Sequence, residues 1–207
     1  MYDPTVSPDP SEFLDTSIHV RRAQGGDPGS IDWLVRHLTP VLLAQAEMVI
    51  PDELRRHVDA DDVVSEAWGI VLPKLGDIRE RNGRVTPPLM KYFSTVVRNR
   101  VRTLGRDVQG RMKSSESAER ARRDITEEPF LALIRAERHS ALYREIQALE
   151  SLDRTILVRR GIEQVAVAEL AEALDMRPNS LTIKYLRLLA KLRNRFRGSV
   201  LDELDES

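Results

Sequence analysis

Apolar residues in this chain recur at three- and four-residue spacing almost from end to end, and no stretch of any length alternates apolar and polar side chains. The clearest run is Leu181, Tyr185, Leu188 and Leu192. Such spacing places apolar side chains on one face of an α-helix, whereas a strand needs a period of two. Only 5% of the residues are aromatic and 31% are charged, which also favours helices. The sequence therefore predicts an all-α protein.

Two helical regions are separated by a stretch that is poor in large apolar side chains. Residues 106–124 are rich in Arg, Ser and Glu, a composition typical of a linker. We expect two small helical domains joined by a flexible linker, the second a helix-turn-helix domain with a tight turn before Pro178. The expected segments are a disordered acidic N-terminal arm (1–17), a first helical domain (18–106), a basic polar linker (107–135), the helix-turn-helix domain (136–198) and an acidic tail (199–207).

Glycine, proline and capping residues predict where several helices begin and end. Asp27 or Ser30 can cap a helix that continues to about Pro51. The apolar stripe over residues 89–104 should end at Gly105. The short helix marked by Ile156 and Leu157 should end before Gly161.

The net charge of −1 conceals a separation of charge along the chain. Residues 1–17 and residues 201–207 each carry four acids and no base, which leaves +7 on residues 18–200. Acidic ends on a basic body indicate a partner that is a polyanion.

Several classes of protein are excluded. The chain has no cysteine, so it forms no disulfide and has no thiol nucleophile, and no apolar run approaches the ~20 residues that span a bilayer. The acidic, Pro-rich start is unlike a signal peptide. The four histidines show no metal-binding spacing, and no glycine-rich nucleotide loop is present. We expect a soluble cytoplasmic protein that is not an enzyme, needs no cofactor or metal and does not contact the membrane.

The last predicted helix is strongly basic. Residues 177–197 contain seven bases and no acid, and the apolar side chains occupy the opposite face. The first turn, around Asn179 and Ser180, offers backbone N–H groups and short polar side chains, as the reading end of a DNA-recognition helix does. The alternative is a solvated basic helix in an ordinary bundle; the helix-turn-helix period favours DNA.

A second basic cluster spans residues 98–123, with nine bases against three acids, and directly follows Tyr92 and Phe93. Aromatic rings beside a cationic helix can stack on single-stranded bases. We expect Phe93 to be a core residue. Tyr92 is either a stacking platform or a half-buried surface ring.

The acidic run over residues 59–66, DADDVVSE, has three interpretations. A metal site would need further oxygen ligands, and a catalytic pair of Asp62 and Glu66 has no accompanying nucleophile. Carboxylates at a helix start are ordinary, and we expect Asp59 to be such a cap. Asp62, Ser65 and Glu66 lie opposite the apolar face, so a docking surface for a basic partner is the functional interpretation.

Three segments, in this order, resemble an RNA polymerase sigma factor of the sigma-70 family, of the compact extracytoplasmic-function type with two helical domains. They are DADDVVSEAWGIVLPKL (59–75), MKYFSTVVRNRVRTLGR (90–106) and ALESLDRTILVRRGIEQVAVAELAEALDMRPNSLTIKYLRLLAKLR (148–193). The resemblance implies a subunit that binds core RNA polymerase, recognises the -35 and -10 promoter elements and promotes DNA melting. In the family the first segment binds the β′ clamp helices, the second melts the -10 element, and the third reads the -35 element and touches the β flap.

The resemblance also implies the residues at each surface. Polymerase-binding residues are Asp59, Asp61, Asp62, Ser65 and Glu66, with Ser65 standing where the family usually has Gln. The residues implied to bind the single-stranded -10 element are Tyr92, Thr95, Arg98, Asn99 and Arg102. A loop over residues 79–86 would hold a flipped base. The residues implied to bind the -35 duplex are Arg177, Asn179, Ser180, Thr182, Lys184 and Arg187. Ile183, Leu186 and Leu189 are unusually apolar and suggest, as a hypothesis, a strip that an anti-sigma protein or a second subunit covers.

Two rival functions make different predictions. A stand-alone helix-turn-helix transcriptional regulator would need only residues 130–198 and would bind duplex DNA without core polymerase. An enzyme acting on nucleic acid would use the carboxylates of residues 59–66 to hold Mg²⁺, and would cleave only with a divalent cation.

Overall fold

The computed structural model of the 207-residue chain describes residues 15–113, 129–137 and 140–204. The described part is built from helices and contains no strand; its one extended pairing is an isolated bridge between Arg81 and Arg84. The all-α prediction is confirmed. The elements are α1 (Asp15–Gln24), α2 (Pro28–Val49), η2 (Asp52–Leu54), α3 (Ala60–Val71), η3 (Leu72–Asp77), α4 (Thr86–Lys113), α5 (Pro129–Glu137), α6 (Ala141–Ala148), α7 (Ser151–Ile156), η5 (Leu157–Ile162), α8 (Val167–Ala173), α9 (Pro178–Arg195) and η6 (Val200–Glu203).

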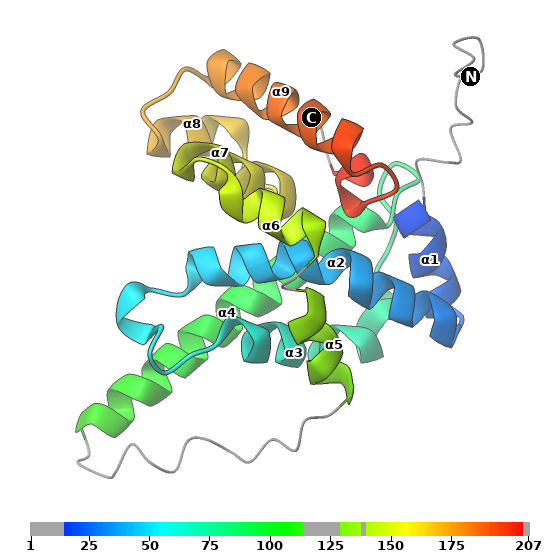
Figure 1. Ribbon diagram of the computed structural model, residues 1–207, viewed down its shortest axis with the longest axis vertical. Coiled ribbons are helices and arrows are strands. Elements are labelled where there is room, and N and C mark those ends of the chain that lie inside the picture. The colour runs from blue at the N-terminus through cyan, green and yellow to red at the C-terminus, as the bar shows by residue number, and fades with distance from the viewer. Residues whose placement is uncertain (1–14, 114–128, 138–139, 205–207) are drawn as a thin grey trace.

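Helix α2 is the central element of the fold (Figure 1). Its start is set locally, because the Asp27 carboxylate accepts a hydrogen bond from the Ser30 backbone N–H at 3.0 Å, and Pro28 occupies the first turn, where a missing N–H costs nothing. The predicted face, which includes Leu34 and Leu38, is buried. Residues 41–46 are buried without interruption, because helices cover α2 on two sides.

The two sides of α2 carry different helices. Figure 1 shows α6–α9 on one side of α2, with α3, α4 and α5 on the other. Trp68 of α3 and Phe93 of α4 meet edge to face, 4.5 Å between ring centroids, and the Trp68 indole N–H donates to the Thr39 hydroxyl of α2 at 3.1 Å. One continuous apolar core joins the residues before α5 to those after it. The division into two domains therefore stays a prediction.

The second half contains a helix that does not end where the sequence predicted. The chain continues from α7 through Gly161 as the π-helix η5, which runs to Ile162. Gly161 permits this packing, because a Cβ there would lie 3.1 Å from Leu204 Cδ1 and 3.2 Å from the Tyr185 hydroxyl. The next connection, residues 174–177, reverses the chain through Asp175, whose φ is +50°, and α9 begins at Pro178.

Segment ends also differ from the expected boundaries. Helix α4 continues past Gly105 to Lys113, and α5 forms within the expected linker. Thr16 and Ser17, expected in the N-terminal arm, are buried in α1. Residues 199–204, expected in the acidic tail, pack into the core. The rest of the arm and the linker residues 114–128 lie outside the described residues.

Candidate nucleic-acid and docking surfaces

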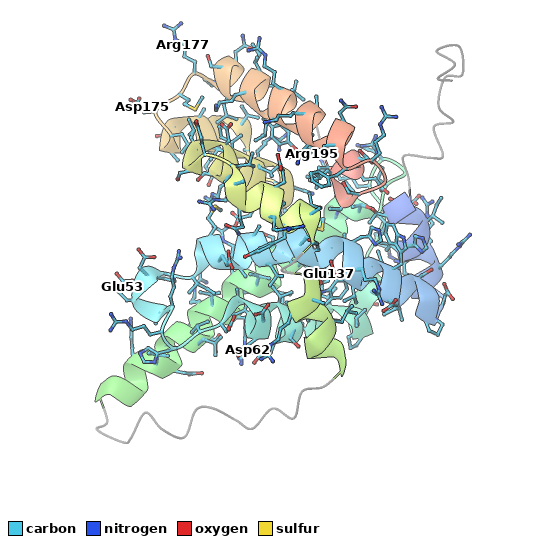
Figure 2. The ribbon with its side chains drawn as sticks, viewed as in Figure 1. Glu53, Asp62, Glu137, Asp175, Arg177 and Arg195 are labelled. Atoms are coloured by element: carbon cyan, nitrogen blue, oxygen red, sulfur yellow. The ribbon has the colours of Figure 1, made fainter. Side chains whose placement is uncertain are left out.

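Helix α9 presents its basic face at one edge of the molecule. Arg177, Asn179, Ser180 and Arg187 are exposed. In Figure 2, Arg177 lies near Asp175 at one end of α9 and Arg195 lies near the other. Because no side chain caps the first turn of α9, the backbone N–H groups of Asn179 and Ser180 are available at the positive end of the helix dipole. This end of α9 can accept an anion.

Two predicted -35 residues are engaged within the protein. The Thr182 hydroxyl donates to the Pro178 carbonyl at 3.0 Å, and Lys184 Nζ lies 2.5 Å from the Asp153 carboxylate of α7. Both side chains are only partly exposed. The Lys184–Asp153 pair holds α9 on α7. It also lowers the positive charge at the centre of the basic face of α9.

The apolar residues of α9 divide between core and surface. Leu181, Tyr185, Leu188 and Leu192 are buried, as their spacing predicted. Leu189 is also buried, so it cannot belong to the exposed strip expected from the sequence. Only Ile183 and Leu186 remain in that strip, 42% and 37% exposed. Leu189 points inward because residues 199–204 and η5 enclose a second side of α9, a contact that helical spacing alone does not reveal.

Helix α4 carries the predicted single-strand surface. Thr95, Asn99 and Arg102 are exposed, whereas Tyr92 is half-buried against the core and Phe93 is fully buried. The Thr95 hydroxyl donates to the Lys91 carbonyl one turn earlier, at 2.9 Å. The exposed residues follow one side of the helix at spacings of three and four, so they form one continuous stripe. The bases of the predicted cluster over residues 111–123 lie outside the described side chains.

Arg98, in the same stripe, contacts a buried carboxylate that the sequence did not reveal. Arg98 Nη1 lies 3.4 Å from Glu163 Oε2 at the end of η5, and Arg159 pairs with the same oxygen at 2.7 Å. The other Glu163 oxygen accepts from the Gln45 amide of α2 at 3.1 Å. That amide also donates to the Ser94 hydroxyl at 2.7 Å. This network joins α2, α4 and η5 at the centre of the molecule.

The acidic segment begins α3, as its composition predicted. Asp59 is the cap, since its carboxylate accepts from the Asp61 backbone N–H at 3.0 Å. Asp61 is buried, so it offers little surface to a partner in this conformation. Glu66 is exposed and accepts from Arg100 of α4 at 2.7 Å. Asp62 and Ser65 are half-buried.

Helix α5 packs against α3 and α2, beside Asp62. Partial burial raises the pKa of the Asp62 carboxyl, the negative charge of Asp59 raises it further, and Arg135 of α5 lowers it. Burial likewise raises the pKa of Glu137 at the end of α5, against an opposing effect of Arg36. Figure 2 shows Asp62 on the side of the molecule away from α9. The acidic α3 surface and the basic face of α9 therefore lie on different sides of the molecule.

The loop before α4 is also largely exposed. Arg79, Arg81 and Arg84 face solvent, and the turn at Asn82 and Gly83 has positive φ angles of 54° and 74°. Arg21 of α1 fixes this turn by donating to the Gly83 carbonyl at 2.9 Å. Three arginines on one short loop give it a cationic surface next to the start of α4.

Metal and membrane sites are absent from the part of the chain that the structure describes. No three His, Asp or Glu side chains there come together to hold a metal ion. Residues His19 and His37 instead stack on the two faces of Trp33, with centroid distances of 4.1 and 3.7 Å. No described helix combines the length and hydropathy needed to cross a membrane.

Comparison with known proteins gives no further constraint. No protein-family model matches the chain, and no curated protein matches its sequence.

Proposed function

We propose that this protein is a promoter-specificity subunit of bacterial RNA polymerase, of the extracytoplasmic-function type in the sigma-70 family. In this proposal it binds core polymerase, recognises the -35 and -10 elements and promotes DNA melting, and it catalyses no reaction itself. The observation that carries the proposal is the exposure of two separate cationic helix surfaces, on α9 and α4, on a chain whose α3 surface is acidic.

The α9 surface is suited to duplex DNA. Arg177 and Arg187 are exposed cations that can pair with phosphates, and the uncapped first turn adds backbone donors beside Asn179 and Ser180. An exposed helix end with short polar side chains can enter the major groove and contact base edges. Residues 167–195 would then act as the helix-turn-helix unit of a second domain.

The α4 stripe is suited to unpaired DNA. Asn99 and Arg102 offer hydrogen bonds and charge beside the Tyr92 ring, and the arginine loop lies at the start of the same helix. Holding unstacked bases on such a surface lowers the cost of opening the duplex. The melting function is assigned to this stripe.

The α3 surface is proposed to bind polymerase through Asp62, Ser65 and Glu66. Its acidity suits a basic partner and would repel DNA, which separates protein binding from nucleic-acid binding. The partial burial of Asp62 under α5 implies that α5 has to move before the whole surface is available.

A second function is favoured by the independence of the α9 surface. The free end of α9 needs nothing from the first half to meet DNA, so a stand-alone helix-turn-helix regulator in the cytoplasm is the alternative. It predicts binding to duplex DNA in the absence of polymerase, with an affinity that falls steeply with salt.

Two experiments distinguish the promoter-specificity subunit from the stand-alone regulator. They are co-purification with core RNA polymerase and then transcription from a randomised promoter library. The proposal expects a stoichiometric complex and transcripts that start downstream of shared -35 and -10 sequences. Glu66→Lys should weaken the complex, and Glu53→Lys, at another exposed acid, in η2, should not. No association with core, together with tight duplex binding by the free protein, would favour the regulator.

A further inference from the structure

The C-terminal segment, residues 199–204, is a folded part of the molecule. The Ser199 hydroxyl caps η6, and the Asp202 carboxylate accepts from the Gly198 backbone N–H at 2.7 Å. Arg193 of α9 donates to the carbonyls of Leu201 at 2.8 Å, Leu204 at 3.1 Å and Asp202 at 3.3 Å. This segment is therefore held firmly to the end of α9.

Glu203 reaches from this segment into the first half of the chain. Its residue is only 1% exposed, and one carboxylate oxygen accepts from the Ser17 backbone N–H at 2.9 Å. The other accepts from the Thr86 hydroxyl at 2.7 Å and from the Ser17 hydroxyl. The side chains of Ser17 and Thr86 also contact each other, at 3.1 Å between their oxygens. Three donors from the first half thus surround one buried anion from the second.

The position of these donors explains why a carboxylate is stable there. Thr86 is the first residue of α4, and Ser17 is the third residue of α1, so both lie where helix N–H groups and the helix dipole favour negative charge. Hydrogen bonds to the ionised form offset the cost of its burial. The acid at position 203 therefore has a specific structural role.

Apolar contacts accompany the carboxylate. Val200, Leu201 and Leu204 are fully buried, and Leu204 packs on Gly161 of η5. Figure 1 shows η6, at the red end of the chain, beside α1 and the loop that leads into α4. The C-terminal segment is thus one of the points at which the second half is joined to α1 and α4.

We propose that residues 199–204 are an intramolecular clamp, with Glu203 as its anchor, that holds the second half of the chain on the first. Release of Glu203 lets the second half move away. Movement of η5 then separates Glu163 from Arg98, so that the Arg98 guanidinium, already part of the exposed α4 stripe, loses its carboxylate partner and can pair with a phosphate. The effect of opening on DNA binding rests on the proposed function. The clamp between the two halves does not depend on that function.

The test measures opening and DNA binding separately. Because the chain has no cysteine, Glu53→Cys and Glu172→Cys can be labelled with a donor and an acceptor fluorophore, one in each half. Glu203→Ala should lower energy transfer while the helix content by circular dichroism stays unchanged. Glu203→Gln, which keeps the shape but not the charge, should lower it less. The matched control is Glu150→Ala, which removes an exposed glutamate that makes no capping hydrogen bond.

DNA binding is then measured by fluorescence anisotropy with a forked promoter duplex and with its blunt counterpart, each with core polymerase present. The clamp predicts about a tenfold gain in affinity for the fork on Glu203→Ala. Energy transfer equal to that of the Glu150→Ala control would overturn the clamp, as would loss of helix content in place of opening. Opening without any gain in fork binding would keep the clamp and overturn the role given to the freed Arg98 in DNA binding.

Discussion

Arg98 of α4 and Glu163 at the end of η5 form an ion pair between the two halves of the chain, with 3.4 Å between Nη1 and Oε2. The Glu163 side chain is fully buried, whereas the Arg98 side chain is 43% exposed. The pair joins a cation of the proposed single-strand surface to a buried hydrogen-bond network. The state of this surface therefore depends on how the second half is packed.

Glu163→Gln should lower the free energy of unfolding by about 1 to 3 kcal/mol, because Arg159 loses its carboxylate partner in a buried site. Urea denaturation followed by circular dichroism measures this. Glu53→Gln, an exposed acid, should change stability by less than about 0.5 kcal/mol. Equal stability of the two variants would show that the network is energetically unimportant.

Arg187→Ala should weaken binding to duplex promoter DNA by a similar factor for all sequences and reduce the slope of log affinity against log salt by about 1. Arg187 is an exposed cation in the middle of α9, where it can pair with a phosphate. Titrations at four salt concentrations measure the slope. Arg36→Ala, an exposed arginine of α2, is the control and should leave the slope unchanged. An unchanged slope for Arg187→Ala would remove this residue from the DNA surface.

Tyr92→Ala should reduce promoter opening, since one base–aromatic stack is worth about 1 to 3 kcal/mol. Tyr92→Phe should retain opening because the ring is kept. Permanganate reactivity of unpaired thymines in the polymerase complex reports opening directly. Since Tyr92 is half-buried, thermal unfolding of both variants distinguishes lost stacking from lost packing. Similar opening by the alanine and phenylalanine variants would assign Tyr92 to packing alone.

Asp62→Asn should raise stability relative to the wild type more at pH 7 than at pH 4. Burial raises the pKa of Asp62 in the folded protein above its ordinary value of 3.8, so the folded state holds this proton more tightly than the unfolded state. Its contribution to stability therefore falls as the pH rises from 3.8 through the raised pKa. Urea denaturation at the two pH values measures the difference.

The control for Asp62→Asn is Asp77→Asn, at an exposed aspartate. The Asp77→Asn variant should change stability by less than about 0.5 kcal/mol, as is usual for an exposed substitution. The proposed function adds that Asp62→Asn weakens binding to core polymerase at pH 7. A stability difference that does not change with pH would contradict the assigned pKa direction.

Gly161→Ala should destabilise the protein by about 1 to 3 kcal/mol, because the added methyl group would press on Tyr185 and Leu204 in a filled core. Gly110→Ala in α4 is the matched control. Among the described residues no atom lies within 4 Å of its added methyl group, so it should stabilise the helix by about 0.4 to 1 kcal/mol. Thermal unfolding of the pair measures both effects. A neutral Gly161→Ala would show that residues 199–204 pack loosely on η5.

Features set by nearby residues could be predicted from the sequence. Asp27 and Asp59 cap the helices that their positions indicated, and the apolar period of α9 placed Leu181 and Tyr185 in the core. Helix caps and the buried face of a helix depend on residues within one or two turns, so the local sequence pattern predicts them.

Features that depend on distant residues could not be predicted. No pattern near Glu163 indicates that it is buried, and its hydrogen-bond donor in the fold, Gln45, lies 118 positions earlier. Leu189 was expected at the surface and is buried by segments packed on a second side of α9. Burial of this kind follows from tertiary packing. The spacing of apolar residues along a helix predicts only the one face that is buried against the main core.

The contact between Ser17 and Glu203 joins positions 186 residues apart, which orders events during synthesis. At roughly 5 to 20 residues per second, α1 is made about 10 to 40 s before η6 is made. Until η6 has been made, Ser17 and Thr86 have no Glu203 to contact, and until η5 has been made, Arg98 has no Glu163 to contact. The contact between Ser17 and Glu203 can therefore form only late in synthesis, after both halves of the chain that it joins have been made.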